Sequence, residues 1–512
     1  MTVVPAAPVT DVLLKDLLAA SPGLVDTEFL RLTGALWKDG EATDEALAAV
    51  PGLVDALAGA DEARQGRLAL LLGLLAETEH AAGGGPVTTA VRAGLGRYLP
   101  LLTGARAGGP LQIAVLYLLS HLTEDREAIL AAARDTDLAP DDRTRLERCL
   151  QPLDPDDVVL GRVWPSPHEW QLGDEEVAFD RSWIRSLTPQ QLAATWSSDT
   201  RSVLAYTGAK ALWALRHGTP TVVRDTGAHA EARPQEPPAP RIEEFSRFAD
   251  VLRCPACRGT LSFADSGAAC EACDRSYPLP YGVLDLSAGA GDQHDSSDVL
   301  QNAAGLRGIG FHYEKVLRPA FLRVMGQNWG GAVTPADEDA YLTEQLAAVD
   351  GPVLDVAAGA GRWTAVVAEA AGDRGVLALD LIAPMLAGLR ARLPEIATLR
   401  ASALALPVAD ASLAAVNCWN ALQALPDAKK AIDEIGRVLR PGGRLTLLTF
   451  RWSSDPVYRY FQGSHAFPGS PDGIELFETE QIRTWLRGAG LEPVTETGPG
   501  TFVIVTAQKR AG

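Results

Sequence analysis

Apolar residues follow a helical rhythm through the first 150 residues. Leucines stand at i, i+1, i+4 and i+5 from Leu13 onward, and six more crowd residues 68–75. Pro110 opens a third apolar run at a position where proline is favoured in a helix, and glycine-rich turns such as 81–86 separate the runs. The pattern predicts an all-α domain over residues 1–150, built either as a HEAT-like stack of helix pairs or as an irregular helical bundle.

The segment 151–224 differs in composition from the helices before it. Five of the eleven tryptophans of the chain fall here. A cluster of aromatic side chains either forms a small core or binds a ligand or peptide. We expect a Trp-rich helical extension, followed at 225–246 by a stiff linker whose residues 232–240 are rich in proline.

Short apolar runs alternate with helix-like segments from about residue 340 to the end of the chain. Runs of strand length stand at 376–380, 413–420 and 445–450. Strands that alternate with helices predict a parallel sheet covered by helices. The region 300–512 is therefore expected to have a Rossmann-like α/β fold.

Composition and charge limit the number of domains, the location of the protein and the kinds of partner that we expect. The chain of 512 residues has room for about three domains, and its 47% hydrophobic residues suffice for packed cores. No apolar run approaches the ~20 residues of a membrane helix and the N-terminus lacks a secretory signal, so we expect a cytoplasmic protein. The net charge of −19 makes nucleic acid an unexpected main partner, because polyanions bind clustered Lys and Arg.

Four of the six cysteines form two CxxC pairs separated by twelve residues. They are Cys254, Cys257, Cys270 and Cys273. In a cytoplasmic chain this spacing indicates a metal more often than a disulfide. Four thiolates complete a tetrahedral zinc site without a position for water, so we expect a structural zinc ion that holds together a small ribbon over residues 247–287.

Residues 353–363 read VLDVAAGAGRW. A short apolar run ends in Asp355, and a loop of small residues then leads into a helix. A strand, a tight turn and a helix N-terminus are the local geometry that grips a nucleoside cofactor. A second strand ends in Asp380, 25 residues later, at the position where an acid accepts hydrogen bonds from ribose hydroxyls. The Pro-Gly-Gly at 441–443 ends a later helix and leads into another strand.

These motifs together resemble the class I S-adenosylmethionine-dependent methyltransferases of the methyltransferase 11 type, over residues 340–510. The resemblance implies a mainly parallel seven-stranded sheet and S-adenosylmethionine (SAM) as the methyl donor. The cysteine module and its tail at 277–286 resemble the Trm112-like zinc ribbon, which also precedes the cofactor domain in bacterial ribosomal-RNA guanine methyltransferases. That second resemblance implies a role in interaction or substrate presentation.

The methyltransferase resemblance also assigns cofactor-binding residues. The methionine end is expected at Asp355, Ala357, Gly359 and Gly361, the ribose and adenine at Asp380, Leu381, Ser402 and Ala403, and the sulfonium and substrate side at Asn417 and Trp419. Three positions depart from the family pattern. Ala357 replaces the first glycine, Ser402 replaces an aspartate at the adenine edge, and alanines replace an acid in the fourth strand.

Candidates for catalysis are polar residues near the expected substrate side. A substrate hydroxyl needs a general base, whereas an amine needs only to lose its proton. His312 and Tyr313, just before the α/β region, and His465, in the insertion 451–477, are the catalytic candidates. Asn420, Tyr458 and Glu475 are further polar candidates, and the insertion is expected to cover the substrate.

The helical half carries no catalytic motif and exceeds what a small-metabolite enzyme needs. We therefore expect it to bind a peptide substrate or a protein partner. The order of helical region, ribbon and methyltransferase resembles that of enzymes that tailor ribosomally made peptides, such as the daptide group, in which a terminal amine is methylated. This implies N-methylation of a peptide or natural product. The alternatives are a ribosomal-RNA base methyltransferase, an O-methyltransferase of a small metabolite and a non-catalytic scaffold.

Overall fold

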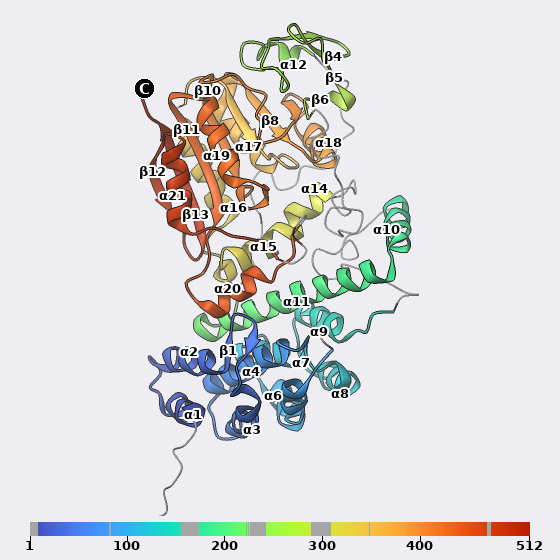
Figure 1. Ribbon diagram of the computed structural model, residues 1–512, viewed down its shortest axis with the longest axis vertical. Coiled ribbons are helices and arrows are strands. Elements are labelled where there is room, and N and C mark those ends of the chain that lie inside the picture. Colours follow the sequence, from blue (N-terminus) through green and yellow to red (C-terminus); the bar gives the residue numbers. More distant parts are fainter. Residues whose placement is uncertain are drawn as a thin grey trace, which may run out of the picture.

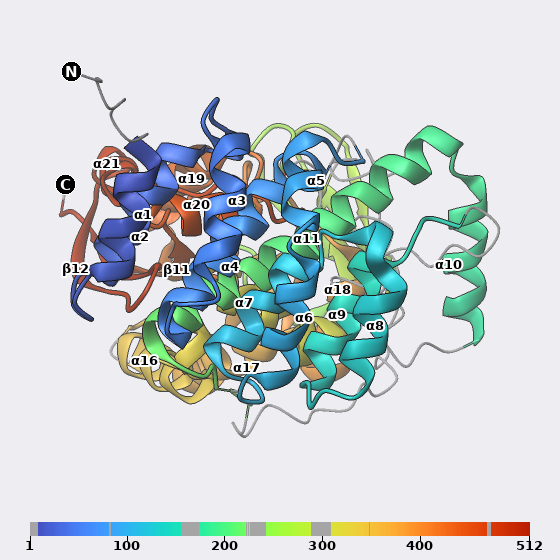
Figure 2. The same cartoon turned by 90° about the horizontal axis from the view of Figure 1, so that it is seen from below.

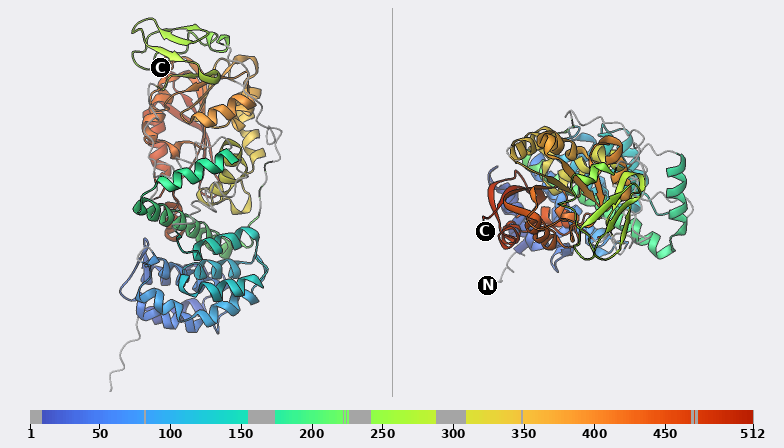
Figure 3. Two further views of the ribbon diagram at one scale, coloured as in Figure 1. Left: turned by 90° about the vertical axis from the view of Figure 1, so that its right-hand side faces the viewer. Right: turned by 90° about the horizontal axis from the view of Figure 1, so that it is seen from above.

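The computed structural model describes residues 9–80, 83–154, 174–221, 223, 225, 242–287, 309–347, 349–467, 470 and 473–511. The molecule is elongated and has three tiers (Figure 1). A helical region lies at one end, an α/β region in the middle, and a small β-rich module at the other end (Figure 3).

The helical region follows the leucine pattern. Its helices are α1 (Val9–Ala19), α2 (Val25–Leu36), α3 (Ala46–Ala56), α4 (Glu62–Glu77), α5 (Pro86–Arg92), α6 (Leu95–Gly104), α7 (Pro110–Leu119), η2 (Thr123–Asp125), α8 (Arg126–Arg134) and α9 (Pro140–Leu150). Residues 66–77 of α4 and 111–119 of α7 are buried on every side. The other helices surround these two (Figure 2), an arrangement closer to a bundle than to an open stack.

This region also contains a short hairpin within the stretch expected to be helical. β1 (Trp37–Lys38) pairs with β2 (Glu41–Ala42), and Asp39 and Gly40 turn between them with φ of 51° and 91°. An Asp-Gly pair favours this left-handed turn. A Cβ on Gly40 would lie 2.8 Å from the Tyr460 ring, so the hairpin packs against a residue of the α/β region.

One long helix connects the helical region to the rest of the molecule. α11 (Pro189–His217) follows α10 (Asp174–Ser186), begins at a capping box of Thr188 and Gln191, and ends at Gly218. It packs on α4, α7 and α9 on one side and on α15 (Arg318–Met325) and α20 (Pro456–Gly463) on the other. A Cβ on Gly208 would lie 2.4 Å from the Phe461 ring, so α11 and α20 approach closely at this glycine.

The tryptophans of the extension that the structure describes are packing residues. Trp196 lies under the Arg148 guanidinium at 3.5 Å, Trp183 belongs to a small buried cluster, and Trp213 packs against the main hydrophobic core. Trp164, Trp170 and most of the proline-rich linker lie outside the described residues.

The β-rich module docks directly on the α/β region. It consists of α12 (Glu243–Ser246), β3 (Leu261–Ala264), β4 (Gly267–Cys270), β5 (Ser276–Pro278) and η4 (Pro280–Gly282). Leu252 forms a bridge with Val408, and the Arg253 N–H donates to the Pro407 carbonyl. The apolar side chains of the module share one buried cluster with the large sheet.

The large sheet has eight strands in the order β12-β13-β11-β10-β7-β8-β9-β6. They are β6 (Val283–Asp285), β7 (Val353–Val356), β8 (Val376–Asp380), β9 (Ala397–Arg400), β10 (Leu413–Trp419), β11 (Leu439–Phe450), β12 (Leu491–Thr497) and β13 (Phe502–Lys509). Strands β6 to β11 pair in parallel, and β12 and β13 are antiparallel. The expected mainly parallel sheet is confirmed.

The expected number of seven strands is wrong. The eighth strand is β6, which the sequence assigns to the tail of the ribbon. It pairs with the edge strand β9, with Leu284 opposite Leu399. An unpaired parallel edge exposes backbone groups, and the ribbon tail satisfies them.

Helices cover both faces of the sheet. The remaining helices of the α/β region are α14 (Ile309–His312), η5 (Tyr313–Leu317), η6 (Asn328–Gly330), α16 (Pro335–Ala347), α17 (Arg362–Ala371), η7 (Gly372–Arg374), α18 (Ala383–Arg392), η8 (Leu422–Ala424), α19 (Ala428–Val438) and α21 (Thr479–Gly488). Apolar side chains of α16, α17 and α18 pack on one face, and those of α19 and α21 on the other. None of the described helices has the length and apolar character needed to traverse a bilayer.

Candidate functional site

The sheet reverses its winding direction between β7 and β10. From β7 the chain proceeds to β8 and β9 on one side, whereas β10 and β11 lie on the other. In open α/β sheets, ligands bind outside the carboxyl ends of the strands at such a switch point. The loop 357–361 leaves the sheet here, next to the end of β10.

A buried polar network spans the switch point. Asp355 accepts from Thr364 Oγ1 at 2.6 Å and from Asn417 Nδ2 at 2.8 Å. Thr446 Oγ1 donates to Asn417 Oδ1 at 2.7 Å, which fixes the orientation of the amide. Burial raises the pKa of Asp355 to about 6, and its two hydrogen bonds oppose that rise. The network therefore joins β7, α17, β10 and β11 at one point.

The loop after β7 has the conformation of a cofactor cradle. Ala357, Gly359 and Gly361 all have positive φ, of 55°, 55° and 87°. No heavy atom lies within 4 Å of the Cβ position of Gly359, whereas a Cβ on Gly361 would lie 2.9 Å from Leu389. Gly359 thus leaves space for a ligand to approach the backbone, and Gly361 permits close packing of α18.

Asp380 joins this loop to the next strand. Its Oδ2 accepts from the Gly359 N–H at 2.9 Å, and its Oδ1 accepts from the N–H groups of Leu381 and Ile382 at 2.7 and 2.9 Å. Each carboxylate oxygen has two lone pairs, so Oδ2 keeps acceptor capacity for a ribose hydroxyl. The small-residue loop, Asp380 and Leu381 therefore lie together, as the sequence predicts.

The adenine-edge candidates lie beside the same strand end. The Ala401 N–H donates to the Asp380 carbonyl, which places Ser402 and Ala403 directly after β9. Ala403 is buried, and the Ser402 hydroxyl accepts from the Leu404 N–H at 3.2 Å. The Ser402 hydroxyl thus stabilises the turn at the position where the family pattern has an aspartate.

The Trp419 indole is held by a buried acid of α16. Its Nε1 donates to Glu338 Oε2 at 2.6 Å, and Glu338 also accepts two bonds from Arg318 at 3.0 and 2.5 Å. The Arg318 guanidinium stacks on the Trp363 ring at 3.8 Å. Sequence reasoning missed Glu338, Arg318 and Trp363, because no spacing pattern relates them.

Asn420 and Tyr313 form the polar wall at the end of β10. Asn420 Nδ2 donates to Tyr313 Oη at 3.0 Å, and Gln423 Nε2 donates to the Asn420 carbonyl at 3.0 Å. Asn420 has φ of 58°, a left-handed conformation that asparagine tolerates better than most residues. Burial raises the pKa of Tyr313, so its hydroxyl stays protonated.

The two candidate histidines lie in different parts of the molecule. His312 precedes Tyr313, and burial lowers its pKa to about 3. His465 is fully buried beside α11, where the next residue, Ala466, donates its N–H to Ser202 Oγ at 2.9 Å, and burial lowers its pKa to about 3 as well. A base with so low a pKa accepts protons poorly near neutrality. Tyr458, another candidate, is buried against α15 and donates to the Val324 carbonyl at 3.0 Å.

The four predicted metal ligands converge. The Sγ atoms of Cys254, Cys257, Cys270 and Cys273 lie within 4.8 Å of one another. Two of the separations are 3.7 and 3.4 Å. Tetrahedral ligands at a Zn–S distance of about 2.3 Å stand about 3.8 Å apart, so the thiolates fit zinc.

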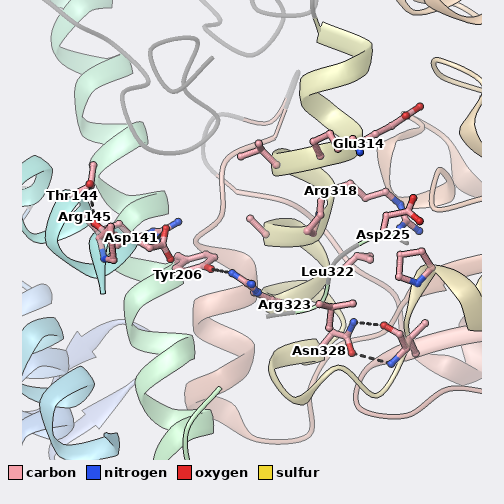
Figure 4. Close-up of a pocket in the computed structure, with 18 of the residues that line it drawn as sticks. Asp141, Thr144, Arg145, Tyr206, Asp225, Glu314, Arg318, Leu322, Arg323 and Asn328 are labelled. Atoms are coloured by element: carbon pink, nitrogen blue, oxygen red, sulfur yellow. Dashed lines mark hydrogen bonds and ion pairs between the residues drawn. The ribbon is translucent and has the colours of Figure 1, made fainter. Parts of the chain in front are cut away.

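A cleft that the sequence does not reveal separates α9 and α11 from η5, α15 and α17 (Figure 4). Its volume is about 640 Å³. Side chains of both signs and several apolar residues line it, among them Arg145, Tyr206, Arg318, Arg323 and Trp363. It is therefore a site to which both halves of the molecule contribute.

Comparison with known proteins finds similarity in sequence and in structure. A methyltransferase-domain family matches residues 353–443. A demethylmenaquinone methyltransferase of Thermus thermophilus is 34% identical over 160 residues, covering 27% of this chain and 73% of the relative. An uncharacterized chloroplastic methyltransferase of Arabidopsis thaliana is 28% identical over 298 residues, covering 51% of this chain and 79% of the relative. A solved methyltransferase structure from Bacillus halodurans is 19% identical, covers 34% of this chain and 99% of that chain, and has a TM-score of 0.30.

Proposed function

Since the chain belongs to the S-adenosylmethionine-dependent methyltransferases, we propose that it methylates a peptide or natural-product amine that its helical half helps to recognise. The observation that carries the cofactor site is the loop 357–361, where Gly359 faces open space and its N–H is held by Asp380. This loop stands at the switch point of a parallel sheet, where a nucleoside cofactor is expected.

Each part of the cofactor has residues to hold it. We assign the methionine end to Asp355, Ala357, Gly359 and Gly361, the ribose to Asp380, and the adenine to Leu381, Ser402 and Ala403. SAM supplies an electrophilic methyl group, so the protein needs to align the acceptor and exclude water. Asn417 acts by fixing the Asp355 carboxylate, to which it donates at 2.8 Å.

The acceptor is proposed to lie beside Asn420 and Tyr313. Their hydrogen-bonded pair stands at the end of β10, adjacent to the cofactor loop. An amine acceptor suits this wall, because methylation of a neutral amine requires no strong base. The low pKa values of His312 and His465 favour a positioning role for Tyr313 over base catalysis by either histidine.

The remaining regions are assigned by their contacts. We propose a helical domain at 1–150, its extension at 151–224, a linker at 225–246, a zinc ribbon at 247–287 and the catalytic domain at 300–512. The insertion 451–477 contributes α20, which packs on α11. It therefore serves mainly to hold the helical half against the catalytic domain, rather than to cover the substrate. The zinc ion is structural in this proposal, since all four of its ligands are cysteines.

The experiment that tests the proposal has two steps. Thermal unfolding of the full chain is measured with and without S-adenosylhomocysteine (SAH), and a bound cofactor product is expected to raise the midpoint. Peptide, RNA and small-molecule pools are then incubated with SAM and examined for mass increases of one methyl group. If SAH does not shift the unfolding midpoint, the proposal of an enzyme is wrong. If only RNA is methylated, the assignment of a peptide substrate is wrong.

A small-metabolite acceptor is the second candidate. It is favoured by the relative from Thermus thermophilus, whose name gives demethylmenaquinone as substrate and whose similarity covers only 27% of this chain. Methyl transfer to the small-molecule pool alone would establish this alternative.

A further inference from the structure

The cleft between the two halves contains buried hydrogen-bond donors that lack acceptors. Arg145 Nε and Trp363 Nε1 are buried and have no hydrogen-bond partner among the described residues. Arg145 is 5% exposed, so solvent does not satisfy its Nε. A buried donor without an acceptor destabilises the folded state. A ligand that offers acceptor oxygens removes that destabilisation.

Four cationic and three acidic side chains line the cleft, and all three acids are paired with arginines. The Asp141 carboxylate pairs with Arg145, and Glu314 pairs with Arg392 at 2.6 Å. Arg318 is neutralised by Glu338, which lies outside the cleft lining. Arg323, in contrast, forms no ion pair in the part of the chain that the structure describes, although the Asp141 carboxylate acts on it at longer range.

Tyr206 adds a further donor beside Arg323. Its Oη accepts from Arg323 Nη1 at 2.9 Å, and within the described residues its own hydroxyl hydrogen has no acceptor. The Arg145 guanidinium stacks on the same phenol ring at 3.7 Å. Arg145, Tyr206 and Arg323 thus stand side by side at the cleft, as Figure 4 shows.

From this arrangement we infer that the cleft binds an oxyanion, a carboxylate or a phosphate, carried by the methyl acceptor. The inference rests on the proposed function for the identity of its occupant. Guanidinium groups bind planar carboxylates and phosphates through paired N–H donors, and a phenol hydroxyl adds a third donor. In a chain with a net charge of −19, an anionic ligand needs such a local cationic site.

The position of the cleft sets a minimum length for the acceptor. Tyr313 of η5 reaches Asn420 at the switch point, whereas Glu314 and Arg318, which flank the same turn, line the cleft. A helix with its side chains is about 10 Å across. The methylated atom and the oxyanion are then separated by about that distance, which fits a peptide better than a single amino acid.

The test uses two variants that remove donors of the cleft and two that make the same exchange outside it. Arg323→Gln and Tyr206→Phe change the cleft. Arg483→Gln, on the exposed face of α21, and Tyr341→Phe, whose hydroxyl contacts Thr506 at 2.8 Å, are the matched controls. Binding of glutarate and of inorganic phosphate to each full-length protein is measured by calorimetry at constant ionic strength, and SAH binding is measured in the same samples.

We expect at least one probe to bind the wild type and both controls equally, and to bind Arg323→Gln at least tenfold more weakly. Which probe binds identifies the anion as carboxylate or phosphate. No binding of either probe to the wild type, or equal binding to all five proteins, overturns the inference. SAH binding should be unchanged in every variant, and its absence from the wild type would instead count against the proposed function.

Discussion

Two glycines with nearly the same φ separate the effect of backbone strain from the effect of a bound ligand. Gly359 and Gly372 have φ of 55° and 57°, and neither has a heavy atom within 4 Å of its Cβ position. An alanine in the left-handed region costs about 1–2 kcal/mol, and the ψ of −134° at Gly372 lies outside that region, so the alanine there costs at least as much. Only Gly359 lies in the proposed cofactor cradle, so a difference in cofactor affinity between the two alanine variants reports on the ligand.

We therefore predict that Gly359→Ala and Gly372→Ala both lose stability and that only Gly359→Ala loses cofactor affinity. Both should lower the midpoint of thermal unfolding by a few degrees. Gly359→Ala should bind SAH at least tenfold more weakly, because its methyl group occupies space meant for the cofactor, whereas Gly372→Ala should bind like the wild type. Equal affinities in calorimetry would remove Gly359 from the site.

Asp355 predicts a pH dependence of SAM binding. Its folded-state pKa of about 6 means that the carboxyl group is half ionised near that pH and mostly ionised at pH 7 and above. SAM carries positive charge, so its methionine end binds the ionised carboxylate better. Affinity should rise from pH 5 to pH 7 and then level off, and Asp355→Asn should flatten this profile. Calorimetric titrations at four pH values measure the affinity for SAM. If the affinity of the variant changes with pH as that of the wild type does, Asp355 is not the group responsible.

At the residue scale, local patterns predict the cofactor loop and not its surroundings. Asp355 and Asp380 stand where an acid follows a strand, so their position is encoded locally. Thr446 and Glu338 complete the polar networks from distant elements, and no spacing in the chain reveals them. His465 shows the opposite error. Its residue type suggests a catalytic base, but its burial beside α11 lowers its basicity.

At the scale of elements, the cysteine motif predicts the metal ligands but not how the ribbon joins the large sheet. The CxxC spacing predicts the convergence of four sulfur atoms, which the structure reproduces. It carries no information on β6, since strand pairing with β9 depends on a contact between segments more than 110 residues apart, such as Leu284 and Leu399. The ribbon and the catalytic sheet therefore share a core that the sequence divides between two domains.

This shared core predicts that loss of zinc destabilises the catalytic domain. We expect one zinc ion per chain by elemental analysis, and its removal by a chelator should lower the unfolding midpoint of the whole molecule. Cys254→Ser should lose the metal, whereas Cys149→Ser, which alters a buried cysteine elsewhere, should retain it. A midpoint that does not respond to zinc removal would contradict structural coupling between ribbon and sheet.

At the scale of the whole molecule, the two halves meet at a buried acid. Glu77 of α4 accepts from Tyr117 of the helical region and, at 3.0 Å, from Tyr460 of α20. The Nε2 atom of His121 stands 3.7 Å away, and Arg201 of α11 also acts on the carboxylate. Tyr460 further packs edge-on against Trp37 with ring centroids 5.1 Å apart. The sequence alone does not predict this junction, because its members come from five separate segments.

Burial raises the pKa of Glu77 to about 7, from an ordinary value of 4.5. Between those two values the folded state holds a proton that the unfolded state has released, so stability falls as the pH rises from 4.5 to 7 and is constant above. The full loss is about 3 kcal/mol.

Glu77→Gln has no proton to release, and its amide still hydrogen-bonds with the tyrosines. We predict that, in thermal unfolding at pH 5, 6, 7 and 8, the midpoint of the wild type falls relative to that of Glu77→Gln as the pH rises. At pH 8 the variant should be the more stable of the two proteins. A variant that follows the wild-type profile at all four values would show that the junction does not titrate through Glu77.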